Sequence, residues 1–120
     1  MTSVLRLPEY LSPTLNQWQR LHYRARAREK KRVMDHIAVA LLDVPGELWF
    51  DGYVNVLYTR LRRAGPPMDH DNLCGSFKPI GDALESMGVV WNDSRIILHT
   101  LQRRVEKGDW WGTLLEFYEG

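Results

Sequence analysis

Three aspartates and one lysine in the second half of the chain are the residues whose types and spacing could do chemistry. Asp69 and Asp71 stand two apart, Lys78 follows them, and Asp93 comes later in the run Trp-Asn-Asp. In an extended segment the side chains of Asp69 and Asp71 leave the same face. Two neighbouring carboxylates repel each other and need a positive charge between them, and their hard oxygen ligands suit Mg²⁺, for which Mn²⁺ can substitute. The pattern predicts a metal-dependent phosphodiesterase, since a divalent cation polarises a phosphoryl oxygen and activates water.

Two aspartates spaced this way are more often simply solvated in a loop, so the context of the pair matters. The pair follows a strand whose end carries three arginines, and Asp93 returns after the next helix. Lys78 lies between the acids in sequence and could anchor a phosphate or stabilise a leaving oxygen. Its alternative role is a solvated lysine paired with Asp82 one helical turn away. For Asn72, capping the following turn is favoured over a hydrogen bond to an aspartate.

The elements that must position these residues follow from apolar periodicity. Residues 53–61 alternate as a strand, and apolar residues at 73, 77, 80, 84 and 87 form a helical stripe. Pro79 places the firm helix at 79–87, ended by Gly88. Residues 96–106 and 113–118 read as two strands joined by a Gly-rich turn, which predicts a hairpin.

The first half of the chain adds one strand and one helix. Residues 4–7 read as a short strand, residues 8–17 as a loop, and about 24–42 as a helix with Val33, Ile37 and Ala40 on its apolar face. The order of these elements predicts an α/β or α+β fold, in which a mixed sheet packs with two helices.

The chain length and composition predict one small soluble domain over residues 1–120. Hydrophobic residues make up 44% and charged residues 26% of the chain, as in ordinary globular proteins. No apolar run is long enough to span a membrane, and no signal-peptide pattern follows Met1. The lone Cys74 excludes an internal disulfide and fits a reducing cytoplasm.

Positive charge gathers in the first half of the chain and suits a polyanion. Residues 1–63 carry 11 Lys and Arg against 6 Asp and Glu, a balance of +5, and residues 64–120 carry 5 against 9, a balance of −4. Such cations contact nucleic-acid phosphates without regard to sequence. A solvated helix face explains part of the set about equally well. The candidate DNA-binding residues are Arg24, Arg26, Arg28, Lys30, Lys31, Arg60, Arg62 and Arg63.

Taken together, the ordered motifs resemble the RusA family of Holliday junction resolvases. The matching run begins Asp69-His70-Asp71-Asn72-Leu73 and continues as Lys78-Pro79, Asp82-Ala83-Leu84, Gly88 and Trp91-Asn92-Asp93. An early Pro-Thr-Leu-Asn at residues 13–16 also looks like the N-terminal loop of the family. The chain departs from the best-known member before Lys78, where Cys74, Gly75 and Ser76 look inserted.

The resemblance implies a small homodimeric α/β domain that cuts four-way DNA junctions by paired, symmetric nicks. By this resemblance Asp69, Asp71 and Asp93 bind Mg²⁺, and Lys78 assists catalysis. The protein would then be a cytoplasmic enzyme of DNA recombination and repair, encoded by a bacterium or a phage. Two alternatives stay open: a non-catalytic DNA-binding protein on the same fold, and a nuclease for flaps or single-stranded DNA.

Overall fold

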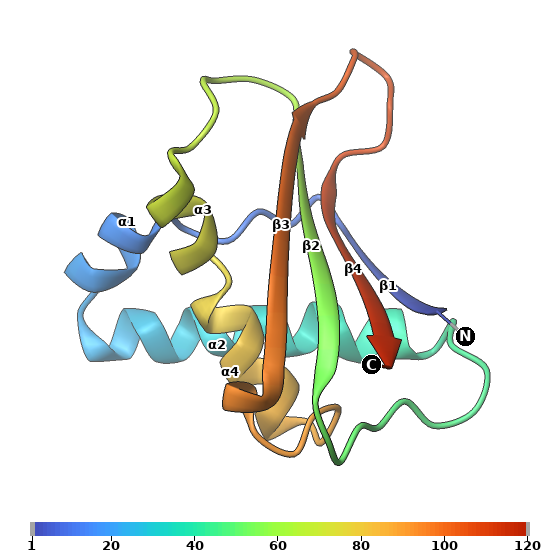
Figure 1. Ribbon diagram of the computed structural model, residues 1–120. Coiled ribbons are helices and arrows are strands. Elements are labelled where there is room, and N and C mark those ends of the chain that lie inside the picture. The colour runs from blue at the N-terminus through green and yellow to red at the C-terminus, as the bar shows by residue number, and fades with distance from the viewer. Residues whose placement is uncertain (1, 120) are drawn as a thin grey trace.

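A four-stranded mixed sheet organises the fold, with its strands in the order β1-β4-β2-β3 (Figure 1). The computed structural model describes residues 2–119. The strands are β1 (Thr2–Pro8), β2 (Val54–Arg62), β3 (Ile96–Arg104) and β4 (Gly112–Glu119). Strand β4 runs antiparallel to both β1 and β2, whereas β3 runs parallel to β2 at one edge.

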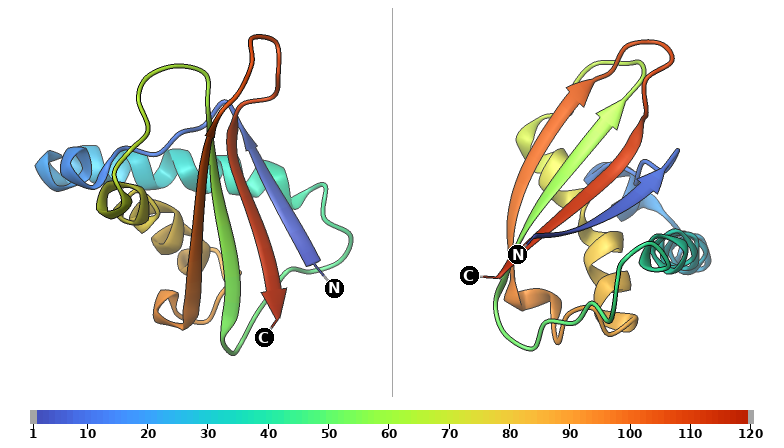
Figure 2. Two further views of the ribbon diagram at one scale, coloured as in Figure 1. Left: turned by 45° about the horizontal axis from the view of Figure 1, so that its top comes forward. Right: turned by 90° about the vertical axis from the view of Figure 1, so that its right-hand side faces the viewer.

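Helices cover one face of this sheet and leave the other face open (Figure 2). The helices are α1 (Leu15–Arg20), α2 (Tyr23–Leu41), α3 (His70–Gly75) and α4 (Lys78–Ser86), followed by the short 3₁₀-helix η1 (Asp93–Arg95). The core between the layers joins α2 and α4 to alternate residues of the strands. Its fully buried side chains include Val33, Ile37, Val56, Ile80, Leu84, Leu115 and Phe117. The chain is therefore one small α+β domain, as the element order predicted.

Most of the predicted elements are confirmed within a few residues. The helix expected at 24–42 is α2, and its predicted apolar residues Val33, Ile37 and Ala40 are buried. The strand expected at 53–61 is β2, and the helix expected at 79–87 is α4. Gly88 ends α4 with a φ of 74°, a conformation that glycine adopts without steric cost.

The predicted hairpin of the last two strands is wrong. Strands β3 and β4 form close to their expected positions, but β2 lies between them in the sheet. Strand β3 pairs with β2 in parallel from Val54 opposite Ile96 to Arg62 opposite Arg104. Strand β4 pairs with β2 on its other side, so the turn after β3 carries the chain past the end of β2 rather than closing a hairpin.

Helix α1 replaces part of the segment predicted as loop. Thr14 caps this helix, since its side chain accepts from the backbone N–H of Gln17 at 3.0 Å. The Gln17 side chain accepts in return from the backbone N–H of Thr14 at 2.9 Å. This reciprocal capping box satisfies two backbone donors and starts a helix in a Pro-rich segment.

Of the three residues that look inserted before Lys78, Ser76 is fully buried and Gly75 packs against a neighbouring helix. The Ser76 hydroxyl donates to the backbone carbonyl of Leu73 at 2.6 Å and also contacts the Tyr58 hydroxyl at 2.8 Å. Gly75 lies directly against Leu15, so α1 and α3 approach closely at this point. Gly75 and Ser76 therefore join α3 to α1 and to the centre of β2.

Gly75→Ala should destabilise the protein by about 1–3 kcal/mol, the usual cost of overpacking. A Cβ at Gly75 would collide with the Cβ, Cγ and Cδ1 of Leu15. Urea unfolding followed by circular dichroism measures the change. The matched control is Gly52→Ala, because a Cβ at Gly52 meets no atom within 4 Å. Equal unfolding midpoints for the two variants would contradict the close approach of α1 and α3.

Within residues 2–119, no helix has both the length and the apolar character needed to cross a membrane.

Candidate active site

Asp69 begins helix α3 rather than lying in an extended run with Asp71. One oxygen of the Asp69 carboxylate accepts from the backbone N–H of Asn72 at 2.8 Å, and the other accepts from the Asn72 side chain at 3.1 Å. The expectation that Asn72 caps is wrong, since Asp69 is the cap and Asn72 its partner. Aspartate favours this position because its oxygen satisfies a free helical N–H.

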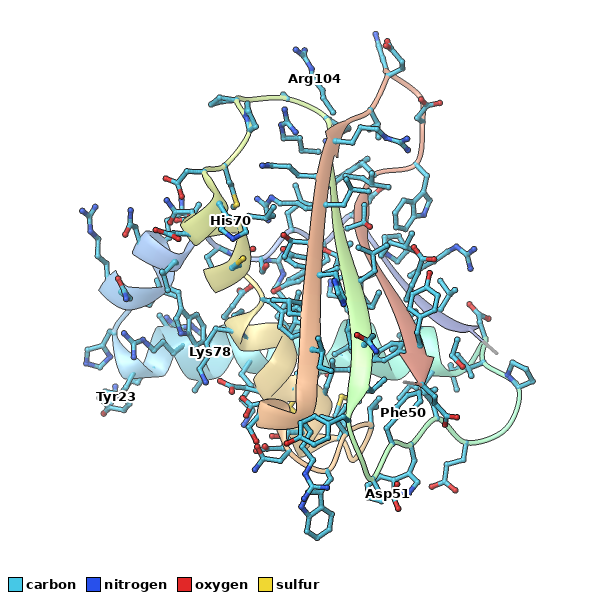
Figure 3. All side chains as sticks on the ribbon, viewed as in Figure 1. Tyr23, Phe50, Asp51, His70, Lys78 and Arg104 are labelled. Atoms are coloured by element: carbon cyan, nitrogen blue, oxygen red, sulfur yellow. The ribbon has the colours of Figure 1, made fainter. Side chains whose placement is uncertain are left out.

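Because Asp69 begins a helix, the Asp69 and Asp71 carboxylates are not arranged as they would be in an extended segment. His70 and Asp71 lie in the first turn of α3, and residues two apart on a helix do not face each other. The prediction that Asp69 and Asp71 share one face of an extended segment is therefore wrong. Both side chains are exposed. On the same turn, the His70 ring lies 3.6 Å from the Cys74 sulfur (Figure 3).

Lys78 and Asp93, which are distant in the sequence, lie in contact. The Lys78 ammonium lies 3.7 Å from an Asp93 oxygen and 3.2 Å from an Asp82 oxygen. The contact with Asp82 is the i, i+4 pair expected for a lysine on a polar helix face, and Lys78 makes both contacts. A hydrogen bond from the Asp93 backbone N–H to the Glu85 side chain, at 2.9 Å, also ties η1 to α4.

The nearby carboxylates raise the pKa of Lys78 above its ordinary value. Asp82 is the largest cause, through its hydrogen bond and its charge, and Asp93 adds to it, whereas desolvation acts in the opposite direction. Lys78 is therefore a fixed cation at neutral pH, suited to hold a phosphate and unsuited to act as a general base. Its side chain is 55% exposed, so the ion pairs contribute little to stability.

Asp69 and Asp71 lie far from Asp93. The Gln102 side chain binds both backbone groups of Met68, at 2.9 and 2.7 Å, which fixes Asp69 beside the last third of β3. Asp93 precedes Ile96, where β3 starts. Gln102 lies six residues further along β3 than Ile96, a span of about 20 Å.

This separation leaves no assembled metal site in one copy of the chain. Among residues 2–119, no three His, Cys, Asp or Glu side chains gather closely enough to hold a metal ion. The predicted ligand set therefore divides into two parts. Asp69 and Asp71 lie at the start of α3, and Asp93 lies with Lys78 at the start of β3.

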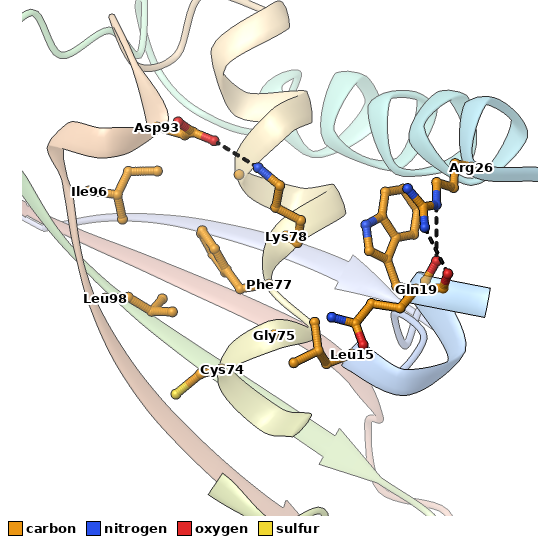
Figure 4. A pocket seen from close by; sticks show the side chains of 12 residues that line it. Leu15, Gln19, Arg26, Cys74, Gly75, Phe77, Lys78, Asp93, Ile96 and Leu98 are labelled. Atoms are coloured by element: carbon orange, nitrogen blue, oxygen red, sulfur yellow. Dashed lines mark hydrogen bonds and ion pairs between the residues drawn. The ribbon is translucent and has the colours of Figure 1, made fainter. Parts of the chain in front are cut away.

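A groove of about 530 Å³ leads away from the Lys78–Asp93 pair (Figure 4). Phe77, Ile96 and Leu98 line its apolar part, and Trp18 with Arg26 lines the far end. The Arg26 guanidinium lies 5.6 Å from the centre of the Trp18 ring and donates to the Trp18 carbonyl at 3.1 Å. The groove thus has a cation near each end and an aromatic wall, which suits a nucleotide.

The candidate DNA-binding cations differ in exposure and in their contacts. The Arg24 Nε donates to the Tyr23 hydroxyl at 3.3 Å, and the Lys31 ammonium lies 3.9 Å from an Asp35 oxygen. Arg24, Arg28 and Lys31 are exposed along α2, and Lys30 is half-buried. The remaining four contact backbone carbonyls or an aromatic ring. Arg26 binds the Trp18 and Gln19 carbonyls, Arg60 the Ser12 carbonyl, Arg62 the Gly65 carbonyl, and Arg63 stacks over Trp111.

Two features of this region were missed by the sequence analysis. The groove is one, because it joins Leu15 and Trp18 to β3 across a distance that no local pattern encodes. The other is an exposed aromatic pair, Trp49 and Trp91, whose ring centres lie 6.5 Å apart. Trp91 comes two residues before Asp93, so the run Trp-Asn-Asp contained a signal for an aromatic group beside the site.

Known proteins give no further assignment, since the chain matches no protein-family model and no curated protein.

Asp82→Asn should lower the pKa of Lys78 more than Asp93→Asn does. Each substitution removes a negative charge that favours the ammonium form, and Asp82 is both the nearer and the larger influence. Titration of the Lys78 side chain by heteronuclear NMR measures both changes. Glu106→Gln, far along the chain beyond β3, is the control and should leave the titration in place. A larger response to Asp93→Asn would contradict the geometry.

Proposed function

We propose that this protein is a dimeric, Mg²⁺-dependent endodeoxyribonuclease that cuts four-way DNA junctions by paired nicks, as a resolvase of the RusA kind. The observation that carries the proposal is the contact between Lys78 and Asp93. These residues are separated by a helix and a buried turn, and the resemblance assigns them to one site. They lie 3.7 Å apart at the mouth of a groove.

Each part of the site has a distinct role in this proposal. Lys78 holds the scissile phosphate, and its raised pKa keeps the charge in place near neutral pH. The exposed cations Arg24, Arg28 and Lys31 hold the DNA backbone on either side of the cut. Asp69, Asp71 and Asp93 would hold the Mg²⁺, which when bound supplies positive charge to the phosphoryl oxygen.

The metal ligands of one copy do not fit this role alone. About 20 Å of strand lies between Asp93 and the Asp69–Asp71 pair, whereas cation ligands stand within about 2.5 Å of the metal. We therefore infer that each site takes Asp69 and Asp71 from one copy and Asp93 with Lys78 from the other. A two-fold dimer then holds two equal sites, which matches the symmetry of a four-way junction.

Junction cleavage should require Mg²⁺ and fall on the order of a hundredfold or more in Asp71→Asn. The loss of one ligand removes several kcal/mol of charge stabilisation, and each 1.4 kcal/mol is about tenfold in rate. The assay compares an immobile four-way junction with linear duplex, in Mg²⁺ and in EDTA. Asp109→Asn, in the turn before β4, is the control and should cut normally. Mg²⁺-dependent cutting by Asp71→Asn at the normal rate would overturn the assignment.

Mixing two inactive variants should restore nicking if the sites are shared. In a dimer of one Asp71→Asn copy and one Asp93→Asn copy, one site carries both substitutions and the other carries neither. Co-expression at equal levels should give about a quarter of the wild-type active sites, because half of the dimers are mixed. The products should be single nicks rather than paired ones. A mixture as inactive as its components would show that each site belongs to one copy.

A non-catalytic junction-binding protein is the second candidate. The divided carboxylates favour it, since a chain that never assembles the three aspartates retains only its cations for DNA. Junction binding in a gel shift, with no nicks over a range of Mg²⁺ and Mn²⁺ concentrations, would select this candidate. A preference for flaps or single strands over junctions in the same assay would instead select the alternative nuclease.

A further inference from the structure

The groove that opens at the Lys78–Asp93 pair has apolar walls that stay partly open to water. Its half-buried apolar residues come from α1 and β3 and are Leu15, Trp18, Ile96 and Leu98. Ile96 and Leu98 lie on one side of the groove, and Leu15 lies on the other (Figure 4). Apolar surface left in contact with water inside a recess favours a ligand that has an apolar surface of its own.

Two glycines shape this groove. Gly75 lets α1 approach α3, because it leaves room for Leu15. Gly81 lines the groove beside Phe77 and Asp93, and a Cβ there would stand 3.2 Å from the Phe77 ring and 3.8 Å from the Asp93 Cβ. The absence of side chains at these two positions leaves a continuous path from the charged mouth to the apolar walls.

The charged residues that line the groove favour an anion. Arg26 and Lys78 are cations and Asp93 is the one carboxylate among the lining residues of the described chain, so their balance is +1. Asp82 and Asp93 both pair with Lys78, yet the lysine side chain is 55% exposed and open to a further partner. A phosphate can therefore reach the Lys78 ammonium at the mouth of the groove.

The size of the groove restricts what can enter it. Its volume of about 530 Å³ is that of a small-molecule site. A DNA duplex is far wider, since its major groove alone measures about 12 Å across. A single nucleotide joins a phosphate to a base with flat apolar faces, which is the combination that the mouth and the walls provide.

We propose that this groove binds one unstacked nucleotide of the junction, with its phosphate at Lys78 and its base between the apolar walls beside Trp18. The inference rests on the proposed function for the source of the nucleotide. It adds a binding site for a base to a site that otherwise contacts phosphates.

Such a site selects branched DNA by the cost of removing a base from its stack. That cost is full in a continuous duplex and lowest where pairing and stacking are already interrupted. Strands change partners at the centre of a four-way junction, so the helical stack is interrupted there. Contact of the base with an aromatic wall offsets the smaller cost and is tolerant of sequence. Trp18 is then a residue that determines specificity for DNA shape.

Thymidine 5′-monophosphate tests the groove without a junction or a metal. Titration followed by proton–nitrogen NMR should shift the Trp18 indole and the amides of Gly75 and Gly81, which line the groove. Thymidine and inorganic phosphate, titrated separately, should each bind about tenfold more weakly or worse, because each makes only part of the contacts. Equal binding of either fragment, or no shift at these residues, would overturn the proposal.

Two variants test the groove on DNA in the presence of EDTA. Trp18→Ala should weaken junction binding about tenfold in a gel shift and leave linear-duplex binding unchanged. Leu98→Trp fills the groove with an apolar side chain and should have the same effect, with a wild-type circular dichroism spectrum. Trp110→Ala, on a tryptophan that is 39% exposed between β3 and β4, is the matched control and should bind both DNA forms normally. Unchanged junction binding by Leu98→Trp, or an equal loss on both DNA forms, would overturn the groove.

The two proposals fail in different ways. A protein that binds the monophosphate in the groove but never nicks a junction keeps the nucleotide site and refutes the nuclease. A protein that nicks junctions in Mg²⁺, but whose groove binds no monophosphate, keeps the nuclease and refutes the nucleotide site.

Discussion

The parallel pairing of β2 with β3 is the constraint on which the rest of the structure depends. Two parallel strands in register force the connection to return along their full length, because β3 must start where β2 starts. Helices α3 and α4 make that return journey (Figure 1). The connection leaves β2 through the Asp69 cap and reaches β3 through Asp93. The parallel pairing therefore places the Asp69–Asp71 pair and Asp93 at opposite ends of the sheet.

The sequence predicted what is local and missed what is long-range. Apolar spacing placed α2 and α4 correctly, since a helix must bury one face whatever it packs against. The same reasoning located β3 and β4 but paired them with each other. The alternation of apolar and polar residues along two strands is the same whether the strands pair with each other or a third strand lies between them. The pattern reports which face of a strand is buried and does not identify the strand beside it. The capping box of Thr14 and Gln17 was a readable signal for α1 that a Pro-rich context concealed.

For the candidate site too, the residues could be selected from the sequence and their arrangement in space could not. Residue types and order were enough to select Asp69, Asp71, Lys78 and Asp93, and the approach of Lys78 to Asp93 agrees with that selection. The sequence does not encode the distances between these residues directly. The spacing of Asp69 and Asp71 predicts an extended backbone, whereas Asp69 begins a helix. The residues that look inserted before Lys78 illustrate the limit. Their role is to pack Gly75 against Leu15 and to bind Ser76 to Tyr58, which no spacing argument could supply.

A cation site whose ligands are divided over about 20 Å cannot hold a metal ion in an isolated copy of the chain. In the proposed dimer, where each site takes ligands from both copies, assembly and catalytic competence are a single equilibrium, and sites exist only in pairs. A nuclease built this way cannot nick from one copy alone, which is the behaviour that symmetric resolution of a junction requires.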